Sequence, residues 1–545
     1  MKLWVRNLIF FGFCLVLAGL VAGRLLKQEP FVKPEHHDSD VVADAGFQAA
    51  VQNVNESFAT DWSESGLEPA PRADDLALAR RLSLALTGSI PSLEEVRALE
   101  SVEAADRGQW WLSHLFEDRR YGDYLAERMA RMSVGVEGGP FIVYRRHRLV
   151  SWLSDEIMEN RPYDELVRTL ITAEGIWTTK PEANFVTVTI DPNNDEEGPD
   201  EKKLAGRVAK AFLGVRLDCV QCHDDFMEDK WTQKDFHQLA AFFAGAEMSM
   251  TGLRDDVDKE YEYRYLGKRE DEPVPMVVPF RNELLPGEGK PRDRIATWVT
   301  HPENRAFART LVNRTWALLF NRPLNFPIDD IPLEGPFPPG MEALADDVIA
   351  NGFDVQRLIR VIAATDAFQR DSRAAEGEHP VTEGQEQLFA AFPITRLRPE
   401  QMAGSVLQSS SLRTIDAESH VFKRVLRFFQ QNDFIKRYGD AGEDEFKELG
   451  GTIPQRLILM NGELVHERTS DNIVLNAATR IGAVSPDNET AVETAYLTTL
   501  TRRPTDEESV YFVDRLKSRA EQKKAELMED LFWTLINSTE FSWNH

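Results

Sequence analysis

The stretch 218–223 reads Asp-Cys-Val-Gln-Cys-His and contains two of the three cysteines of the chain. Its pattern, Cys-x-x-Cys-His, is the attachment motif of a c-type haem. Residues three apart share one face of a helical turn, so the thiols of Cys219 and Cys222 can both reach the vinyl groups of one porphyrin. His223 follows four residues after Cys219 on the same face, where its imidazole can bind the iron. Residues 218–223, the motif turn, therefore predict one covalent haem c with two thioethers and His223 as the proximal ligand.

Three other interpretations of the cysteine pair are a disulfide, half of a zinc site and a thioredoxin-like redox pair. A zinc site needs four ligands, normally with a second Cys or His pair at a set spacing. Only His237 is nearby, and the remaining cysteine, Cys14, lies in an N-terminal apolar segment. A thioredoxin-like pair needs a preceding strand and a parallel sheet, and neither pattern is evident. The complete motif favours haem over these three.

The N-terminus predicts export. An apolar run at 8–22 has basic residues on both sides, which is typical of a signal peptide or a signal anchor within residues 1–24. Residues 25–72 are polar, acidic and contain several prolines, and they predict a tether with one weak helix at 41–58. We expect the body of the chain in the cell envelope, on the periplasmic side, either released or anchored to the inner membrane. In bacteria, c-type haem is attached outside the cytoplasm.

Composition and motifs exclude several classes of function. The formal net charge is −27 at pH 7, which would repel a phosphate backbone, so nucleic acid is excluded as a partner. The sequence contains no Gly-x-Ser-x-Gly, no His-Glu-x-x-His and no glycine-rich phosphate loop. Whether the chain is an enzyme stays open, and a glycan is a candidate partner that no motif supports.

From Asp74 onward, apolar residues recur at helical spacing through most of the chain, which predicts a mainly α protein. Ser92 with Glu95 predicts a capping box at one helix start, and Thr232 predicts the start of a helix at 233–244. The expected organisation is two helical domains, a haem-carrying one at 73–246 and a second at 301–545, joined by a strand-rich connector at 247–300.

Strands are expected in two places. Residues 185–190 alternate like a short strand. Residues 261–280 predict two further strands, because Tyr261, Tyr263 and Tyr265 alternate with charged residues and a proline-rich apolar run follows. The tyrosine row is interpreted as one packed face of a small sheet.

The second axial ligand of the iron is expected after the helix at 233–244. Met248 and Met250 lie between Gly245 and Gly252, in a segment that can fold back to the far face of a porphyrin. We expect Met248 or Met250 to bind the iron, and an open site is the alternative. For either methionine alone, ordinary core packing is a further alternative. His237 reaches the iron only if its helix packs across the porphyrin.

A series of short stretches extends from Asp74 to the C-terminus. They lie at 80–88, 212–216, 219–224, 230–236, 307–316, 351–354, 451–455, 459–462 and 535–541. In their residues and order they resemble planctomycete-type exported proteins that pair a cytochrome-c-like (PSCyt) domain with a C-terminal PSD domain. The resemblance implies this domain layout and a c-type haem, but no particular reaction.

The chain departs from these relatives at two points. Asp225 stands where relatives often have a second histidine, which affects the surroundings of the iron. The separate N-terminal cytochrome domain of many relatives, with its own Cys-x-x-Cys-His, has no counterpart in this sequence. At most one covalent haem is therefore expected, and electron relay would need a redox partner protein.

Two hypotheses about function follow. The first is an exported c-type haem protein that transfers electrons. The second is a non-catalytic envelope protein that binds a partner or a glycan, in which the motif turn is only a disulfide or a metal clip.

Overall fold

The structure is a computed structural model of the chain. It describes residues 44–136, 144–191, 198–224, 231–374, 379–415, 433–439, 446, 451–470, 472, 476–518 and 524–545. The predicted signal segment 1–24, Cys14 and Asp225 lie outside these ranges. Within them, no helix has the length and the apolar character needed to cross a membrane.

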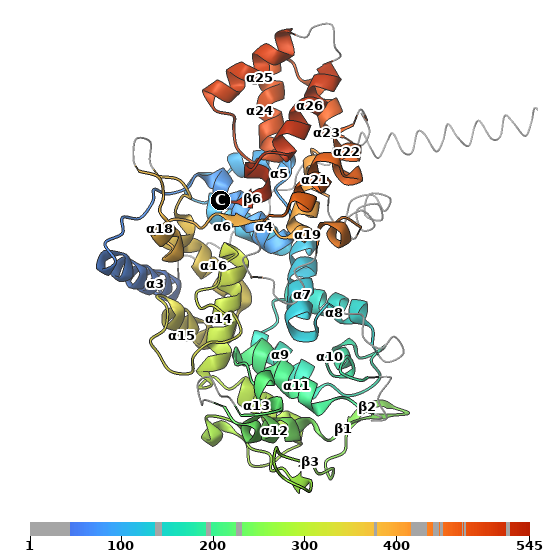
Figure 1. Ribbon diagram of the computed structural model, residues 1–545. Helices are drawn as coiled ribbons and strands as arrows, with labels where there is room; N and C mark the ends of the chain where they lie inside the picture. The colour runs from blue at the N-terminus through green and yellow to red at the C-terminus, as the bar shows by residue number, and fades with distance from the viewer. Residues whose placement is uncertain are drawn as a thin grey trace, which may run out of the picture. The chain divides into compact units, whose positions relative to one another are not determined.

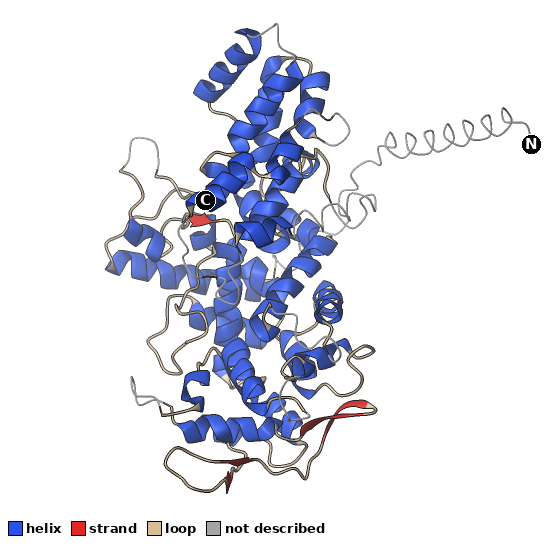
Figure 2. Cartoon of the chain, turned by 45° about the vertical axis from the view of Figure 1, so that its right-hand side comes forward, coloured by secondary structure: helices blue, strands red, loops and turns tan. Residues whose placement is uncertain are grey.

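The chain is mainly α, as the sequence predicts (Figures 1 and 2). The helices of the first half are α3 (Ala45–Glu64), α4 (Asp75–Thr87), α5 (Leu93–Glu100), α6 (Arg107–Glu117), α7 (Arg119–Val134), α8 (Arg146–Met158), α9 (Tyr163–Thr172), α10 (Asn184–Thr187), α11 (Glu201–Val208) and α12 (Gln233–Ala240). Those of the second half are α13 (Pro291–Val299), α14 (Arg305–Phe320), α15 (Met341–Ala350), α16 (Val355–Ala364), α17 (Asp366–Gln369), α18 (Glu383–Gln387), α19 (Pro399–Ser409), α21 (Ile453–Asn461), α22 (Glu463–Thr469), α23 (Ala477–Val484), α24 (Asn488–Thr499), α25 (Asp506–Ser518) and α26 (Lys524–Ile536).

The predicted helix starts at Ser92 and Thr232 are confirmed. Ser92 accepts from the backbone N–H of Glu95, whose carboxylate accepts from the Ser92 backbone N–H in return. Thr232 and Asp235 form the same reciprocal pair at the start of α12. Each pair satisfies two backbone donors that the first turn of a helix leaves without an intrahelical acceptor.

The sheets within the described ranges are small and antiparallel. β1 (Ala246–Ser249) pairs with β2 (Gly252–Asp255), β3 (Glu262–Tyr263) with β4 (Glu272–Pro273), and β5 (Thr395–Arg396) with β6 (Trp543–Asn544). The hairpin expected in 261–280 is therefore present, but it is shorter than predicted. The proline-rich run 274–280 forms no strand, in keeping with the missing backbone donors of its prolines.

The strand predicted at 185–190 is wrong, because α10 begins at Asn184 and helical turns continue to Thr189. The side chains of Asn184, Phe185, Val186 and Thr187 are all buried, so the apolar alternation does not mark a two-faced strand. Asn184 also fixes the turn, because its amide donates to the carbonyls of Trp177 and Pro181 at 2.8 Å each. A helical turn pairs its backbone groups locally, whereas a strand here would need a partner strand.

Helix α3 overlaps the weak helix predicted at 41–58, but its burial differs from the tether predicted for 25–72. It buries five side chains spaced three or four residues apart, Phe47, Ala50, Val54, Phe58 and Trp62. The Phe58 ring stacks on Trp316 of α14 with a centroid distance of 5.3 Å. Trp62 donates through Nε1 to the Leu388 carbonyl at 2.7 Å. This part of the segment belongs to the core, because its apolar residues share one side of the helix.

Replacing Phe58 with alanine tests this assignment of α3. We expect Phe58→Ala to lower the free energy of unfolding by about 3–5 kcal/mol, because a buried aromatic side chain is lost and a cavity remains. Thr60→Ala, at an exposed position of the same helix, is the control and should change it by less than about 0.5 kcal/mol. Equal effects of the two substitutions in urea unfolding would contradict the packing of α3 in the core.

Helix α4 packs with the C-terminal part of the chain. Leu84 and Ile90 belong to one buried cluster with residues of the second half, such as Met402, Val492 and Phe541. Residues Asp38–His545 form one compact unit. The domain boundaries expected from the sequence, at 73–246, 247–300 and 301–545, stay a prediction.

Arg81 of α4 contacts distant segments of the chain across this core. Its guanidinium group donates to the carbonyls of His545 at 2.9 Å, Phe368 at 3.1 Å and Arg370 at 2.8 Å. It also lies 3.7 Å from the centroid of the Phe392 ring. One fully buried cation thus joins α4 to three distant segments of the chain.

Candidate functional site

The motif turn lies between α11 and α12 and forms a short 3-10 turn, Asp218–Gln221, with Cys222 directly after it in a right-handed helical conformation. Residues three apart lie one above the other in a 3-10 turn. Cys219 and Cys222 are exposed thiols, whereas Val220 between them is fully buried. The apolar residue holds the turn against the protein while both cysteines face outward.

His223 is also exposed, and its contact defines its tautomer. Its Nδ1 atom lies 2.8 Å from the carbonyl oxygen of Asp224. Because a carbonyl only accepts, Nδ1 carries a proton, and in the neutral imidazole the lone pair is then on Nε2. Metal-binding histidines commonly donate their second N–H in this way, which orients the ring and fixes the tautomer.

The carbonyl of Gln221 anchors the motif turn. It accepts from His237 Nε2 at 3.0 Å, from the Gln233 side-chain amide at 3.2 Å and from the Tyr263 hydroxyl at 3.4 Å. The Gln233 backbone N–H donates to the Asp224 carboxylate at 2.7 Å, which holds the far end of the turn. Four contacts from α12 and β3 therefore fix a turn whose reactive side chains are exposed (α12 and β3 are labelled in Figure 1).

His237 is a buried, neutral part of this anchor. Its Nε2 donates to Gln221, so its Nδ1 accepts from the Tyr261 hydroxyl at 2.7 Å. Its ring stacks on Tyr263 with a centroid distance of 3.4 Å. Burial lowers the pKa of His237 to about 4, and the charge of Lys202 lowers it further, while the bond to Gln221 opposes both. With both ring nitrogens occupied by protein groups, His237 positions the turn.

The lowered pKa of His237 gives a pH-dependent prediction. The unfolded chain binds this proton with the ordinary pKa of about 6.5, so the contribution of His237 to stability is complete above that pH and is lost as the pH falls toward 4. We expect His237→Ala to lower the free energy of unfolding by about 2–4 kcal/mol at pH 8, because two buried hydrogen bonds and a packed ring are lost.

The deficit of His237→Ala should be smaller at pH 5, where the wild-type chain also loses part of this contribution. Urea unfolding at the two pH values measures it, and His147→Ala, at an exposed position of α8, is the control. A deficit of the same size at both pH values would contradict a neutral, buried His237.

The segment before the motif turn is fixed to the second half of the chain. After α11, residues Ala209–Leu213 form a π-helical turn, which Gly214 ends in the left-handed conformation with φ 60°. A Cβ atom at Gly214 would lie 2.7 Å from Thr310 Oγ1, so the position requires glycine. Arg216 then pairs with the buried Asp329 at 2.6 Å. The motif turn therefore follows a segment that Gly214 and Arg216 hold against the second half of the chain.

Met248 and Met250, the expected distal ligands, lie on a hairpin separate from the motif turn. Met248 is in β1 opposite Leu253, and Met250 is fully exposed at the turn before β2. Core packing is therefore excluded for Met250. The structure brings Cys219, Cys222 and His223 together in one turn, but it does not place either methionine in that turn.

Sequence reasoning missed the anchor. The contact between Gln221 and Gln233 could not be predicted from the sequence, because neither residue belongs to a recognisable spacing pattern. The three tyrosines pack together, as expected, because the rings of Tyr261, Tyr263 and Tyr265 all have their centroids within 6.0 Å of the His237 ring centroid.

A thioredoxin-like pair does not fit, because the sheets in the part of the chain that the structure describes are antiparallel.

The fold and the site together define a class, a mainly α protein with an exposed Cys-x-x-Cys-His turn anchored by a buried histidine. Residues 53–248 match PSCyt2, described as a protein of unknown function (DUF1549), and residues 291–516 match PSD1, described as a protein of unknown function (DUF1553). The chain belongs to the proteins in which a PSCyt domain is followed by a PSD domain. The resemblance seen in the sequence is thereby confirmed for the domain arrangement. Searches of curated proteins and of solved structures find no match.

Proposed function

We propose that this chain is an exported c-type haem protein that transfers electrons in the cell envelope. The observation that carries the proposal is the motif turn, in which two exposed thiols three residues apart precede a histidine with its lone pair on Nε2. Cys219 lies in a 3-10 turn and Cys222 follows it directly with helical backbone angles, and residues three apart on such a turn lie on one side. That arrangement suits two bonds to neighbouring positions on one porphyrin edge.

The residues of the motif turn fit this cofactor. Cys219 and Cys222 would hold a haem c through thioethers, and His223 would bind the iron through Nε2. The bound group would supply one-electron transfer at its iron. For the sixth position we propose Met248 or Met250, of which Met250 is the more exposed.

The surrounding residues orient the turn and keep it from moving. The three donors to the Gln221 carbonyl fix the backbone between the two cysteines. His237 stays neutral at pH 7 because its pKa lies far below that value, so it adds no charge next to the turn.

The chemistry of the motif turn favours haem over a metal clip. A zinc clip needs its ligands to converge on one point, whereas thioethers and an iron ligand bind different atoms of one porphyrin. The partner that the proposal implies is a second redox protein, because the sequence holds a single Cys-x-x-Cys-His.

Redox titration of the chain, produced in a host that matures c-type cytochromes, tests the proposal. We expect a reversible one-electron change of the haem absorption bands and reoxidation by an external acceptor without any substrate. A variant lacking residues 1–24 should carry no haem, because it would not reach the compartment of attachment. A haem-loaded chain that does not cycle reversibly would contradict electron transfer, and full loading of the shortened variant would contradict export.

A further inference from the structure

A tyrosine and a histidine form a buried hydrogen-bonded pair next to the motif turn. The Tyr261 hydroxyl donates to His237 Nδ1 at 2.7 Å, and Nε2 of the same ring donates to the Gln221 carbonyl at 3.0 Å. Tyr261 is 8% exposed and His237 is fully buried, so water does not compete for either bond. The pair joins α12 to the segment just before β3 (Figure 1).

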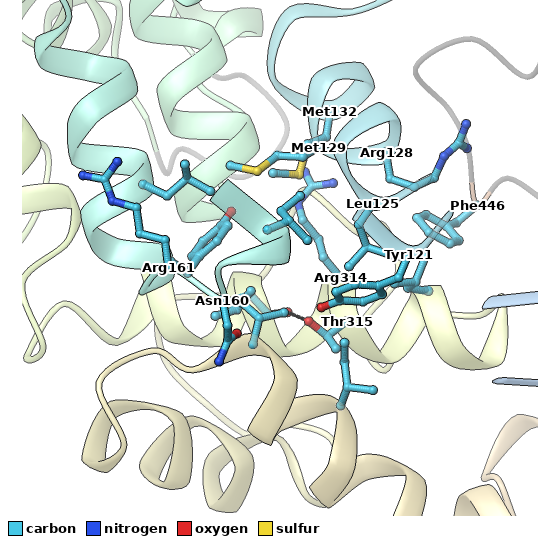
Figure 3. A pocket seen from close by; sticks show the side chains of 17 residues that line it. Tyr121, Leu125, Arg128, Met129, Met132, Asn160, Arg161, Arg314, Thr315 and Phe446 are labelled. Carbon is cyan, nitrogen blue, oxygen red and sulfur yellow. Dashed lines mark hydrogen bonds between the residues drawn. The ribbon is translucent and has the colours of Figure 1, made fainter. Parts of the chain in front are cut away.

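The pair is separate from the apolar cavity in Figure 3. That cavity, of about 120 Å³, lies among α7, α8, α9, α14 and α16, and neither Tyr261 nor His237 lines it.

Two hydrogen bonds connect the Tyr261 phenol to the motif turn. The carbonyl that accepts from His237 belongs to the peptide between Gln221 and Cys222. A path from the phenol to the second cysteine therefore runs through hydrogen bonds and covalent bonds, without a gap. The His237 ring also stacks on Tyr263 with a centroid distance of 3.4 Å, which keeps its orientation fixed. An electron can leave Tyr261 toward the motif turn along this path.

The Tyr261 phenol keeps its proton until an electron is removed. Burial raises the pKa of Tyr261 far above the usual tyrosine value, and the charges of Glu201 and Asp200 raise it further. One-electron oxidation reverses this, because an oxidised phenol is a strong acid and a positive charge on a buried ring is costly. A base within hydrogen-bond distance has to take the proton as the electron leaves.

His237 is placed as that base. Because Nε2 carries the ring proton, Nδ1 holds a lone pair, and it lies 2.7 Å from the Tyr261 hydroxyl oxygen. Burial lowers the pKa of His237 to about 4, whereas the bond to the Gln221 carbonyl stabilises the doubly protonated ring. An oxidised phenol is a far stronger acid than this imidazolium, so the proton transfer is favourable.

We infer that Tyr261 is a redox-active tyrosine that gives one electron to a strong one-electron oxidant at the motif turn. The oxidant gains the electron, the O–H bond of Tyr261 breaks, and its proton forms a new N–H bond at His237 Nδ1. The products are a neutral tyrosyl radical and an imidazolium that donates to the Tyr261 oxygen and to the Gln221 carbonyl. This redox role goes beyond electron transfer by a haem and does not depend on haem attachment.

A photosensitiser attached to the motif turn tests the inference without haem. A tris(bipyridine)ruthenium complex, linked by a maleimide to Cys222 of the haem-free full chain, becomes a strong one-electron oxidant when it is excited in the presence of chloropentaamminecobalt(III). Cys14→Ser and Cys219→Ser leave Cys222 as the only thiol. We expect electron paramagnetic resonance to detect a neutral tyrosyl radical, which forms more slowly in heavy water because a proton moves with the electron. Absence of the radical, or equal rates in both solvents, would overturn the inference.

Three substitutions in the labelled chain assign the roles. Tyr261→Phe keeps the buried ring and removes the O–H bond, so the radical should be lost. Tyr265→Phe, at a half-buried position of the same tyrosine row, is the matched control and should leave the radical yield unchanged. His237→Gln places an amide that takes up no proton, so radical formation should slow about 100-fold or more.

An undiminished radical in Tyr261→Phe, or its loss in Tyr265→Phe, would place the radical on another tyrosine and overturn the assignment. An unchanged rate in His237→Gln would overturn the role of His237 as the base.

High-field electron paramagnetic resonance of the labelled chain covers the case in which Tyr261→Phe or His237→Gln does not fold. The imidazolium Nδ1–H should donate to the phenoxyl oxygen, which lowers the largest g value of the radical and adds an exchangeable proton coupling. A radical without this hydrogen bond would lie outside the Tyr261–His237 pair and would overturn the inference.

Discussion

The double substitution Cys219→Ser with Cys222→Ser is expected to abolish covalent haem attachment. Both thioethers would be lost, so any haem that still associates should be removed by acid–organic extraction of the denatured chain. Haem staining of the chain after denaturing electrophoresis measures the loss. The substituted side chains are exposed, so the fold should persist and helical circular dichroism should be unchanged.

Single substitutions and the third cysteine are the controls for this result. Cys219→Ser or Cys222→Ser alone should leave one thioether and a shifted haemochrome band. Cys14→Ser, in the N-terminal apolar segment, should leave covalent haem at the wild-type level. Covalent haem in the double variant would contradict attachment at the motif turn.

The substitution Arg81→Met is expected to have the largest effect on stability. It removes the donors to three carbonyls, the buried one of Phe368 and the part-buried ones of His545 and Arg370, and a buried acceptor left without a partner costs about 1–3 kcal/mol. The contact with the Phe392 ring adds about 0.5–2 kcal/mol.

One effect opposes this loss. Burial lowers the pKa of Arg81 to about 9, which means that the protein holds a cation there at a cost, and methionine would remove that cost. Three lost carbonyl partners outweigh it, so we expect the free energy of unfolding to fall by more than about 3 kcal/mol.

The test compares the free energies of unfolding of Arg81→Met and of the control Arg119→Met, both measured by urea unfolding. Arg119 pairs with Asp123 and Asp155 on the surface of α7, and such exposed pairs contribute less than about 1 kcal/mol. An Arg81→Met protein as stable as the wild type would mean that α4 is held to the C-terminal segments by apolar packing alone.

Local sequence patterns predicted the local structure well. The capping boxes at Ser92 and Thr232 formed as expected, because they depend on residues only three positions apart. The helical class followed from apolar spacing. The helical turn of the motif also followed from spacing, as Cys219 lies in a 3-10 turn and Cys222 follows it directly in a right-handed helical conformation.

The failures of prediction come from burial and from distant contacts. The apolar alternation at 185–190 was interpreted as a strand, but every side chain from Asn184 to Thr187 is buried, so alternation carried no information about two faces. The polar, acidic and proline-containing stretch 25–72 predicts a tether, and the burial of α3 within it depends on Trp316, which lies far along the chain.

The anchor of the motif turn was beyond prediction for the same reason. Gln221 meets the Tyr263 hydroxyl and the His237 ring, which come from later segments, and no periodicity connects these residues. Met129 of α7 and Leu311 of α14 line one cavity although they lie far apart in the sequence, so their proximity also depends on tertiary packing.

The pyridine haemochrome spectrum of the full chain, produced in a host with cytochrome c maturation and denatured before measurement, tests the central claim most directly. Covalent attachment predicts a c-type haemochrome that stays with the denatured chain, in a ratio of one haem per polypeptide. A chain from that host without covalent haem, whether with a Cys219–Cys222 disulfide or with bound zinc, would contradict it.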